Sequence, residues 1–275
     1  MMNVGICLVH TPGDMPEKFA QAQSFGFHHC QLVSWQPSLW TDAEAQSLNA
    51  LCLAHDITIT ALWCGWEGPT AWNFIDGPEV LGIVPPAYRH ARLQNLKDGV
   101  LFAKMLGTPD LISHMGFIPE NPSDPLYPGV VSAMRSLCNH AKNHGVHILL
   151  ETGQETPITL LRLIEDVASG NLFINLDPAN LLMYGKANPI DALDILGPFL
   201  RGVHAKDGLY PTNGRSLGRE TKVGDGRVNF PALLNALKAA NYRGSLSIEH
   251  EIKSPDHAKN VLDTKHFLDN LLAQL

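Results

Sequence analysis

The chain has 275 residues, of which 45% are hydrophobic and 17% are charged, and its formal net charge at pH 7 is −7. This composition is typical of a globular protein with a large core, and the length fits one (β/α)₈ barrel, so we expect a single domain over residues 1–275. The acidic balance disfavours a nucleic acid as partner, because a phosphate backbone needs a basic face.

The five cysteines are odd in number and include no Cys-x-x-Cys pair, which favours reduced thiols over a disulfide framework. The N-terminal segment lacks a basic stretch followed by a long apolar one, and no later run is long enough to span a bilayer. We therefore expect a cytoplasmic protein with no membrane partner, and a homo-oligomer is left open.

Strands and helices are predicted to alternate through the first half of the chain. Short apolar runs predict strands at Val4–Val9, His28–Val33, Ile57–Trp63 and Asp110–His114. Amphipathic patterns predict helices at Met15–Phe25, Thr41–His55, Pro86–Leu106 and Gly129–His144. Thr41, followed by Glu44, matches a capping box at the start of its helix.

The same alternation continues through the second half. The predicted strands are His147–Glu151, Leu172–Asp177, Leu200–His204 and Ser245–Glu249. The predicted helices are Pro157–Ala168, Asp191–Leu196, Phe230–Ala240 and Asp256–Leu275. About eight strands that alternate with helices predict an α/β fold of the (β/α)₈ TIM-barrel type, with its chemistry on the loops that follow the strands.

Each of the last four predicted strands ends at a potential metal ligand: Glu151, Asp177, His204 or Glu249. Closing the sheet into a barrel brings these ends together. Three carboxylates and one imidazole suit Mn²⁺ or Mg²⁺ better than structural zinc, with Co²⁺ and Zn²⁺ as the alternatives. For any single acidic residue, a helix N-cap or a turn is an equally good interpretation, but four such residues together favour a metal site.

Glu151 and Glu249 lie on well-separated strands, so in a barrel they can approach a substrate from opposite faces. A carboxylate on one face can take a proton from the carbon beside a carbonyl group, and a carboxylic acid on the other face can return one. A divalent cation would stabilise the enediolate oxygens as charge develops. Asp177 and His204 would then act as ligands alone.

Cationic side chains after the seventh predicted strand are candidates for substrate contact. Period-two alternation points Lys206 to the same side as His204, although an ion pair with Asp207 explains it equally well. Further cations lie in the long segment that follows, where barrels often bind phosphate, namely Arg215, Arg219 and Lys222. Solvated surface charge is the default interpretation of these three.

Histidines and aromatic residues after the first four strands provide further substrate-side candidates. His10 and His114 end strands one and four and are expected to donate hydrogen bonds to substrate or to ligand carboxylates. Trp35 and Trp66 are the preferred stacking surfaces for a sugar, and Glu67 adds a polar group. Packing in the core is the competing interpretation for each tryptophan.

Five short motifs follow one another in the second half: Leu150–Gly153, Leu176–Asn180, Gly202–Asp207, Gly224–Phe230 and Ser247–Glu249. In this order and spacing they resemble the sugar phosphate isomerase/epimerase superfamily, the xylose isomerase-like barrels that include ketose 3-epimerases, hydroxypyruvate isomerases and inosose dehydratases. The resemblance extends over essentially the whole chain. It implies a Mn²⁺ or Mg²⁺ centre held by Glu151, Asp177, His204 and Glu249, with the two glutamates doubling as acid and base.

Two positions depart from the ketose 3-epimerase pattern. Asn180 stands where those enzymes typically have a substrate-contacting histidine, three residues after the metal aspartate. An amide keeps the hydrogen-bonding capacity but loses the titratable proton. Tyr210 stands near the place where an arginine often follows the metal histidine.

These observations predict a metal-dependent isomerase or epimerase that acts on a keto-sugar or related polyhydroxy carbonyl compound through a cis-enediolate. The main alternative is a dehydratase or lyase that uses the same centre on a keto-sugar, keto-glycoside or inosose. A DNA-repair endonuclease of related architecture would need a basic groove, which the negative charge disfavours. A non-catalytic sugar-binding barrel is less attractive, because all four ligands are present.

Overall fold

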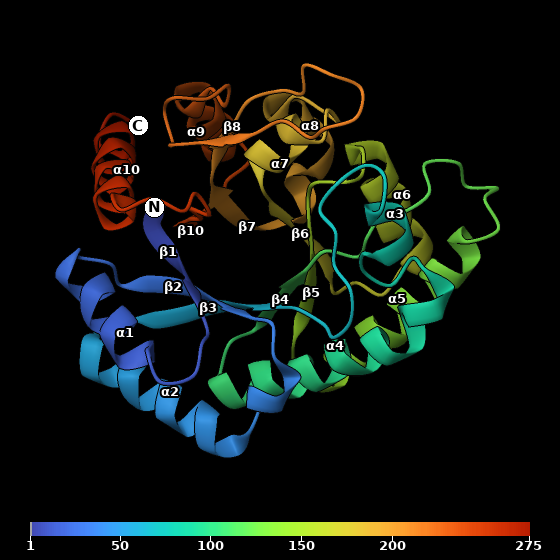
Figure 1. Ribbon diagram of the computed structural model, residues 1–275, viewed down its shortest axis with the longest axis horizontal. Coiled ribbons are helices and arrows are strands. Elements are labelled where there is room, and N and C mark those ends of the chain that lie inside the picture. Colours follow the sequence, from blue (N-terminus) through green and yellow to red (C-terminus); the bar gives the residue numbers. More distant parts are fainter. Residues whose placement is uncertain (1) are drawn as a thin grey trace.

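Among residues 2–275, which the computed structural model describes, eight parallel strands close into a barrel in the order β1-β10-β7-β6-β5-β4-β3-β2 (Figure 1). The barrel strands are β1 (Asn3–Val9), β2 (His29–Ser34), β3 (Thr58–Cys64), β4 (Asp110–Ser113), β5 (His147–Glu151), β6 (Leu172–Leu176), β7 (Leu200–Ala205) and β10 (Ser245–Ile248). The predicted TIM barrel is therefore confirmed, and the final strand pairs with the first to close it.

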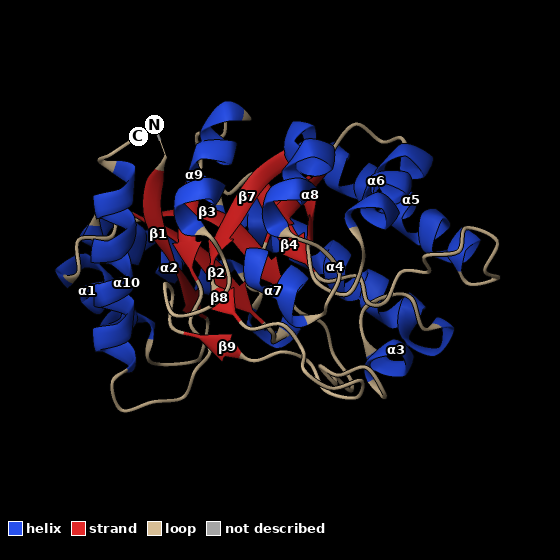
Figure 2. Cartoon of the chain, turned by 90° about the horizontal axis from the view of Figure 1, so that it is seen from above, coloured by secondary structure: helices blue, strands red, loops and turns tan. Residues whose placement is uncertain are grey.

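Helices surround the barrel strands (Figures 1 and 2). The α-helices are α1 (Met15–Ser24), α2 (Asp42–His55), α3 (Gly77–Val80), α4 (Pro86–Leu106), α5 (Tyr127–Asn143), α6 (Pro157–Val167), α7 (Pro178–Met183), α8 (Pro189–Leu196), α9 (Phe230–Ala239) and α10 (His257–Leu272). Two short 3-10 helices are η1 (Pro37–Leu39) and η2 (Gly197–Phe199). No helix within residues 2–275 is both long enough and apolar enough to cross a membrane.

The barrel strands are apolar because helices cover their outer face and the other strands of the closed barrel enclose their inner face. Strand β4 is buried along its whole length. The main core lies between strands and helices, whereas a smaller apolar cluster formed by Val33, Ala61, Trp63, Ile112 and Leu149 is separate from it. Parallel strands thereby present their carboxyl ends at one rim of the barrel, where the loops meet.

Local signals account for several helix boundaries. The Thr41 hydroxyl accepts a hydrogen bond from the amide of Glu44 at 3.2 Å, so the predicted start of α2 is confirmed. Helix α4 ends at Gly107, whose φ of 73° places it in the left-handed region that favours glycine.

The structure adds elements that the sequence did not predict. Helices α3 and α7 follow strands directly or lie within loops, and β8 (Asp207–Gly208) pairs antiparallel with β9 (Glu220–Thr221). Figure 2 shows β9 outside the ring of barrel strands. This small hairpin begins immediately after the segment that carries His204 and Lys206, so it belongs to the rim where the candidate ligands lie.

Candidate metal centre

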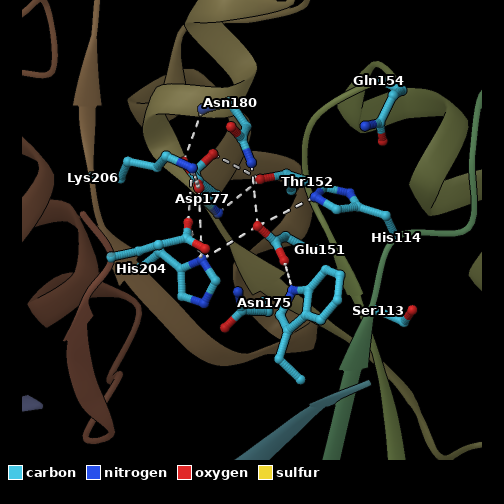
Figure 3. Close-up of polar contacts among 12 residues, drawn as sticks. Ser113, His114, Glu151, Thr152, Gln154, Asn175, Asp177, Asn180, His204 and Lys206 are labelled. Carbon is cyan, nitrogen blue, oxygen red and sulfur yellow. Dashed lines mark hydrogen bonds and ion pairs between the residues drawn. The ribbon is translucent and has the colours of Figure 1, made fainter. Parts of the chain in front are cut away.

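Four side chains from separate strand ends converge at the carboxyl-terminal rim of the barrel. Glu151 ends β5, Asp177 follows β6, His204 lies in β7 and Glu249 follows β10. One ligand atom from each lies within 4.8 Å of the others. Figure 3 shows Glu151, Asp177 and His204 pointing toward one another. The structure thus brings together the four residues that were predicted to share an ion.

The arrangement around His204 tests whether these residues fit a divalent cation. Its Nδ1 lies 3.3 Å from Glu151 Oε1, 3.3 Å from Glu249 Oε2 and 3.6 Å from Asp177 Oδ2. Both His204 Nδ1 and Asp177 Oδ2 are buried without a hydrogen-bond partner. Buried polar atoms normally have partners, and one cation at about 2.0–2.6 Å from each oxygen ligand would supply them. The residues therefore fit an oxygen-rich divalent metal site.

Gln31, which the sequence reasoning missed, fixes the orientation of His204. The His204 Nε2 group donates to Gln31 Oε1 at 2.7 Å, which leaves Nδ1 as the nitrogen with a free lone pair. Gln31 Nε2 in turn donates to Asn175 Oδ1 at 3.4 Å. The sequence held one signal for this role: Gln31 is a polar residue within the apolar run of β2, and alternation places it on the same face of the strand as Val33.

The electrostatics of the cluster favour positive charge at its centre. Burial opposes protonation of His204, but Glu249 and Glu151 raise the pKa of its imidazole well above the ordinary value. Burial would raise the pKa of Glu249, yet Lys206 and His204 lower it. Burial keeps the pKa of Asp177 raised despite Lys206. A divalent cation would provide the positive charge that these buried carboxylates attract.

Glu151 is held by donors from three other strands or their loops. Trp63 Nε1 donates to Oε2, Asn180 Nδ2 donates to Oε1 at 3.2 Å, and His114 Nε2 lies 3.4 Å from Oε1. Burial would raise the pKa of Glu151, but the imidazoles of His114 and His204 hold it well below its usual range. These contacts place Asn180 and His114 beside the predicted acid–base residue.

Asp177 combines the two roles that the sequence left as alternatives. Its Oδ1 accepts a hydrogen bond from the backbone N–H of Asn180 at 2.8 Å and so caps the N-terminus of α7. Its Oδ2 faces His204 instead. The Thr152 hydroxyl further fixes the backbone, because it accepts from the Asp177 amide at 2.8 Å and donates to the Asp177 carbonyl at 2.9 Å. A helix cap therefore orients a candidate metal ligand.

Lys206 points to the same side as His204, as alternation predicted. Its ammonium lies 2.9 Å from Glu249 Oε2 and 2.5 Å from Glu251 Oε2. The suggested partner Asp207 points elsewhere, and its carboxylate accepts four backbone N–H groups, those of Gly208, Gly224, Gly226 and Val228. Asp207 thus organises the Gly224–Phe230 motif rather than neutralising Lys206.

A cavity of about 290 Å³ opens above the cluster. Its wall includes six predicted site residues, namely Trp35, His114, Glu151, Asn180, Lys206 and Glu249. It also includes residues that were not singled out, notably Trp63, Trp72, Glu220 and Glu251. Asp177 and His204 lie fully buried beneath it. The volume is at the lower end of the range for small-molecule sites.

Three predicted substrate contacts, those of His10, Trp66 and Glu67, do not line this cavity. The His10 ring nitrogens bond Ser34 at 2.9 Å and Glu44 at 3.0 Å, between β2 and α2. Trp66 is buried behind Trp35, with an Arg92 guanidinium 5.4 Å from its ring centroid. Glu67 is exposed.

The remaining departure from the ketose 3-epimerase pattern, Tyr210, is also outside the cavity. Tyr210 is exposed, and its hydroxyl donates to the Gly185 carbonyl at 3.2 Å. By contrast, Trp63 reaches the cavity because it is close to the carboxyl end of β3, with its ring 6.0 Å from that of His114. Position at a strand end was therefore a better signal than tryptophan content alone.

Comparisons with known proteins agree with this architecture. The family model described as the xylose isomerase-like TIM barrel matches residues 19–271. A solved structure of a xylose isomerase domain protein from Planctomyces limnophilus is 34% identical with a TM-score of 0.91, and the match covers 98% of this chain and 97% of that one. The family resemblance indicated by the motifs is confirmed.

More distant matches include one solved structure, which shares the fold, and one curated sequence. The structure of a D-tagatose 3-epimerase-like protein is 22% identical with a TM-score of 0.78, over 99% of this chain and 97% of that one. An uncharacterised protein of Methanocaldococcus jannaschii is 28% identical over 193 residues, which make up 66% of this chain and 64% of that protein. The chain thus spans somewhat less than two thirds of the length of this curated relative.

Proposed function

The chain belongs to the xylose isomerase-like TIM-barrel family, and we propose that it is a divalent-metal-dependent isomerase or epimerase of a keto-sugar or a related polyhydroxy carbonyl compound. One observation carries the proposal: two carboxylates from separate strands reach one point at the base of a cavity. Glu151 Oε1 and Glu249 Oε2 each lie 3.3 Å from His204 Nδ1, and both residues line the cavity.

A bound Mn²⁺ or Mg²⁺, held by Glu151, Asp177, His204 and Glu249, would act as a Lewis acid toward the charge that develops on a substrate oxygen. The protein side chains supply the proton transfer. The pKa values of Glu151 and Glu249 are both lowered by neighbouring cationic groups, so either carboxylate can start as the base. The glutamate that has taken up the proton is the acid in the reverse direction.

Other residues hold the two carboxylates in place. Trp63 and Asn180 donate to the two oxygens of Glu151, and Lys206 donates to Glu249. Such contacts restrict the rotamers of the carboxylates, and accurate placement is a large part of the rate enhancement in proton transfer. The tryptophans on the wall offer apolar ring surface to the C–H groups of a sugar and limit the access of water.

The test is to replace Glu151 or Glu249 by glutamine in the metal-loaded protein and to follow solvent deuterium entering keto-sugars in D₂O by proton NMR. We expect each substitution to abolish exchange while the circular dichroism spectrum stays unchanged. Glu165→Gln, which alters an exposed carboxylate on α6, is the matched control. Near-normal exchange in Glu151→Gln or Glu249→Gln would refute the assignment of that glutamate.

A dehydratase or lyase is the second candidate, and the surroundings of His114 favour it. Loss of a β-hydroxyl group needs a proton donor in addition to the base. Burial would lower the pKa of the His114 imidazole, but the neighbouring Glu151 carboxylate raises it above its ordinary value, which favours the protonated form of a group that lines the cavity. The same D₂O experiment separates the two reactions, since an unsaturated product indicates elimination and a deuterated epimer or isomer indicates proton transfer alone.

A further inference from the structure

The outer part of the cavity is strongly acidic. Its wall includes four glutamates, Glu151, Glu220, Glu249 and Glu251, and among residues 2–275 its wall includes no arginine and a single lysine, Lys206. Glu151 and Glu249 belong to the metal cluster, whereas Glu220 and Glu251 lie beyond it and have no role in the proposed proton transfer. These two carboxylates therefore need an explanation of their own.

Lys206 does not offset this acidity for an incoming ligand, because carboxylates already surround its ammonium. Glu251 Oε2 lies at 2.5 Å, Glu249 Oε2 at 2.9 Å and Asp177 Oδ2 at 3.9 Å. The side chain of Lys206 is 4% exposed, so little of it is open to a further anion. A phosphate group here would have to displace Glu251 before it could pair with the lysine.

The cations that were candidates for phosphate binding also lie elsewhere. Lys222 pairs with Asp263 at 2.6 Å, on α10. Arg215 and Arg219 are exposed, and neither lines the cavity. The long segment after β8 therefore leads to a carboxylate at the cavity, that of Glu220 at the start of β9, and places no basic group there.

Glu220 and Glu251 are held next to each other at the cavity wall. Glu220 Oε1 accepts from the Glu251 amide at 2.9 Å and lies 3.5 Å from His250 Nδ1. Burial raises the pKa of Glu220 to about 7 although Lys206 opposes this shift, so the Glu220 carboxylate is fully ionised only above neutral pH. Elsewhere on the wall, Trp35 and Trp72 meet edge to face, with ring centroids 6.3 Å apart.

We propose that the outer part of the cavity binds the uncharged, hydroxyl-bearing tail of the substrate, with Glu220 and Glu251 accepting hydrogen bonds from its hydroxyl groups, and that it excludes phosphorylated sugars. This inference rests on the proposed function and specifies its substrate class. Carboxylates accept hydrogen bonds from hydroxyl groups and repel a phosphate dianion held close to them. The tryptophans complete a surface for a neutral sugar with an apolar face.

The experiment compares three compounds that differ only at carbon 6: D-fructose, D-fructose 6-phosphate and 6-amino-6-deoxy-D-fructose. Deuterium exchange and calorimetric binding are measured on the full chain loaded with Mn²⁺, above neutral pH, where the Glu220 carboxylate is ionised. We expect D-fructose to exceed its phosphate at least about 100-fold in kcat/KM or in affinity, because like charges in an interface discriminate strongly. The Glu220→Gln/Glu251→Gln double variant should reduce this ratio at least tenfold, whereas two exposed substitutions, Glu165→Gln and Glu17→Gln, should leave it unchanged.

Each outcome decides the inference. Equal or better use of the phosphate overturns the inference but leaves the proposed function standing, because the chemistry would still occur. A much stronger preference for the amino compound overturns the assignment to uncharged substrates. Selective binding of D-fructose without exchange would support the inference while counting against the proposed function. If none of the three compounds binds and none exchanges, the inference is overturned.

Discussion

Replacing Gln31 by leucine tests whether the contact beneath His204 sets metal affinity. The substitution removes the acceptor that lies 2.7 Å from His204 Nε2. His204 is fully buried and Gln31 is 3% exposed, so water cannot readily replace the lost acceptor. An unpaired buried N–H group costs about 1–3 kcal/mol, and loss of such a contact to a ligand histidine typically lowers metal affinity by about 10–100-fold.

We expect the upper part of that range for Gln31→Leu, since the imidazole would also become free to place its proton on Nδ1, the nitrogen that faces the other three ligands. Calorimetric titration of the metal-free protein with Mn²⁺ measures the change in Kd. Nitrogen-15 NMR of the imidazole reports the tautomer separately. Gln31→Glu keeps an acceptor at the same place and should bind Mn²⁺ at least as tightly as the parent.

Gln154→Leu is the matched control for this experiment. Gln154 is also buried, and it donates to the Tyr184 hydroxyl at 3.2 Å rather than to a metal ligand. Its removal should leave the Kd for Mn²⁺ unchanged. If folded Gln31→Leu bound Mn²⁺ within about twofold of the parent, the argument from tautomer and orientation would be refuted.

Three further substitutions address other parts of the structure. Burial raises the pKa of Glu155 from 4.5 to about 7, so ionisation of its carboxylate opposes folding increasingly as the pH rises through this window. Glu155→Gln should therefore be more stable than the parent by up to roughly 3 kcal/mol in urea denaturation at pH 8. Equal stability of the two proteins at pH 8 would contradict this. Gly226→Ala should lower the unfolding free energy by about 1–3 kcal/mol in the same assay, because the added Cβ would lie 2.1 Å from Asp207 Oδ1. Unchanged stability would show that the loop moves to accommodate the methyl group at little cost. Trp63→Phe removes a donor to Glu151 and should move the acid limb of the pH–rate profile to higher pH, whereas an unmoved limb would exclude this role.

The barrel could be predicted from the sequence because the strands are short apolar runs and the helices between them have an amphipathic pattern of helical period. The hairpin of β8 and β9 was not, since each strand has two residues and such a length shows no alternation. Helix α7 was also missed, because its six residues are buried nearly throughout and lack an amphipathic pattern. Length and exposure, rather than propensity, limited the prediction of these elements.

The candidate metal cluster was predictable because parallel strands place their carboxyl ends at one rim, which makes four distant residues neighbours by topology alone. Gln31 illustrates what topology leaves out. It contacts His204 across 173 positions of the chain, and only the packing inside the barrel shows that the two side chains meet. His10 illustrates what strand position alone does not decide. It follows β1, but its ring bonds Ser34 and Glu44 rather than facing the cavity.

The ligands and the residues proposed to select substrate are attached to different parts of the molecule. The ligands sit on or directly after strands that are hydrogen-bonded to their neighbours in the barrel. Glu220 instead depends on the β8–β9 hairpin, and the Asp207 carboxylate fixes the adjoining loop through four backbone amides. Changes within residues 209–219 can therefore alter the cavity wall, to which Leu217 already contributes, without displacing a ligand. A barrel of this kind can thus acquire a new substrate while it keeps the same candidate metal cluster.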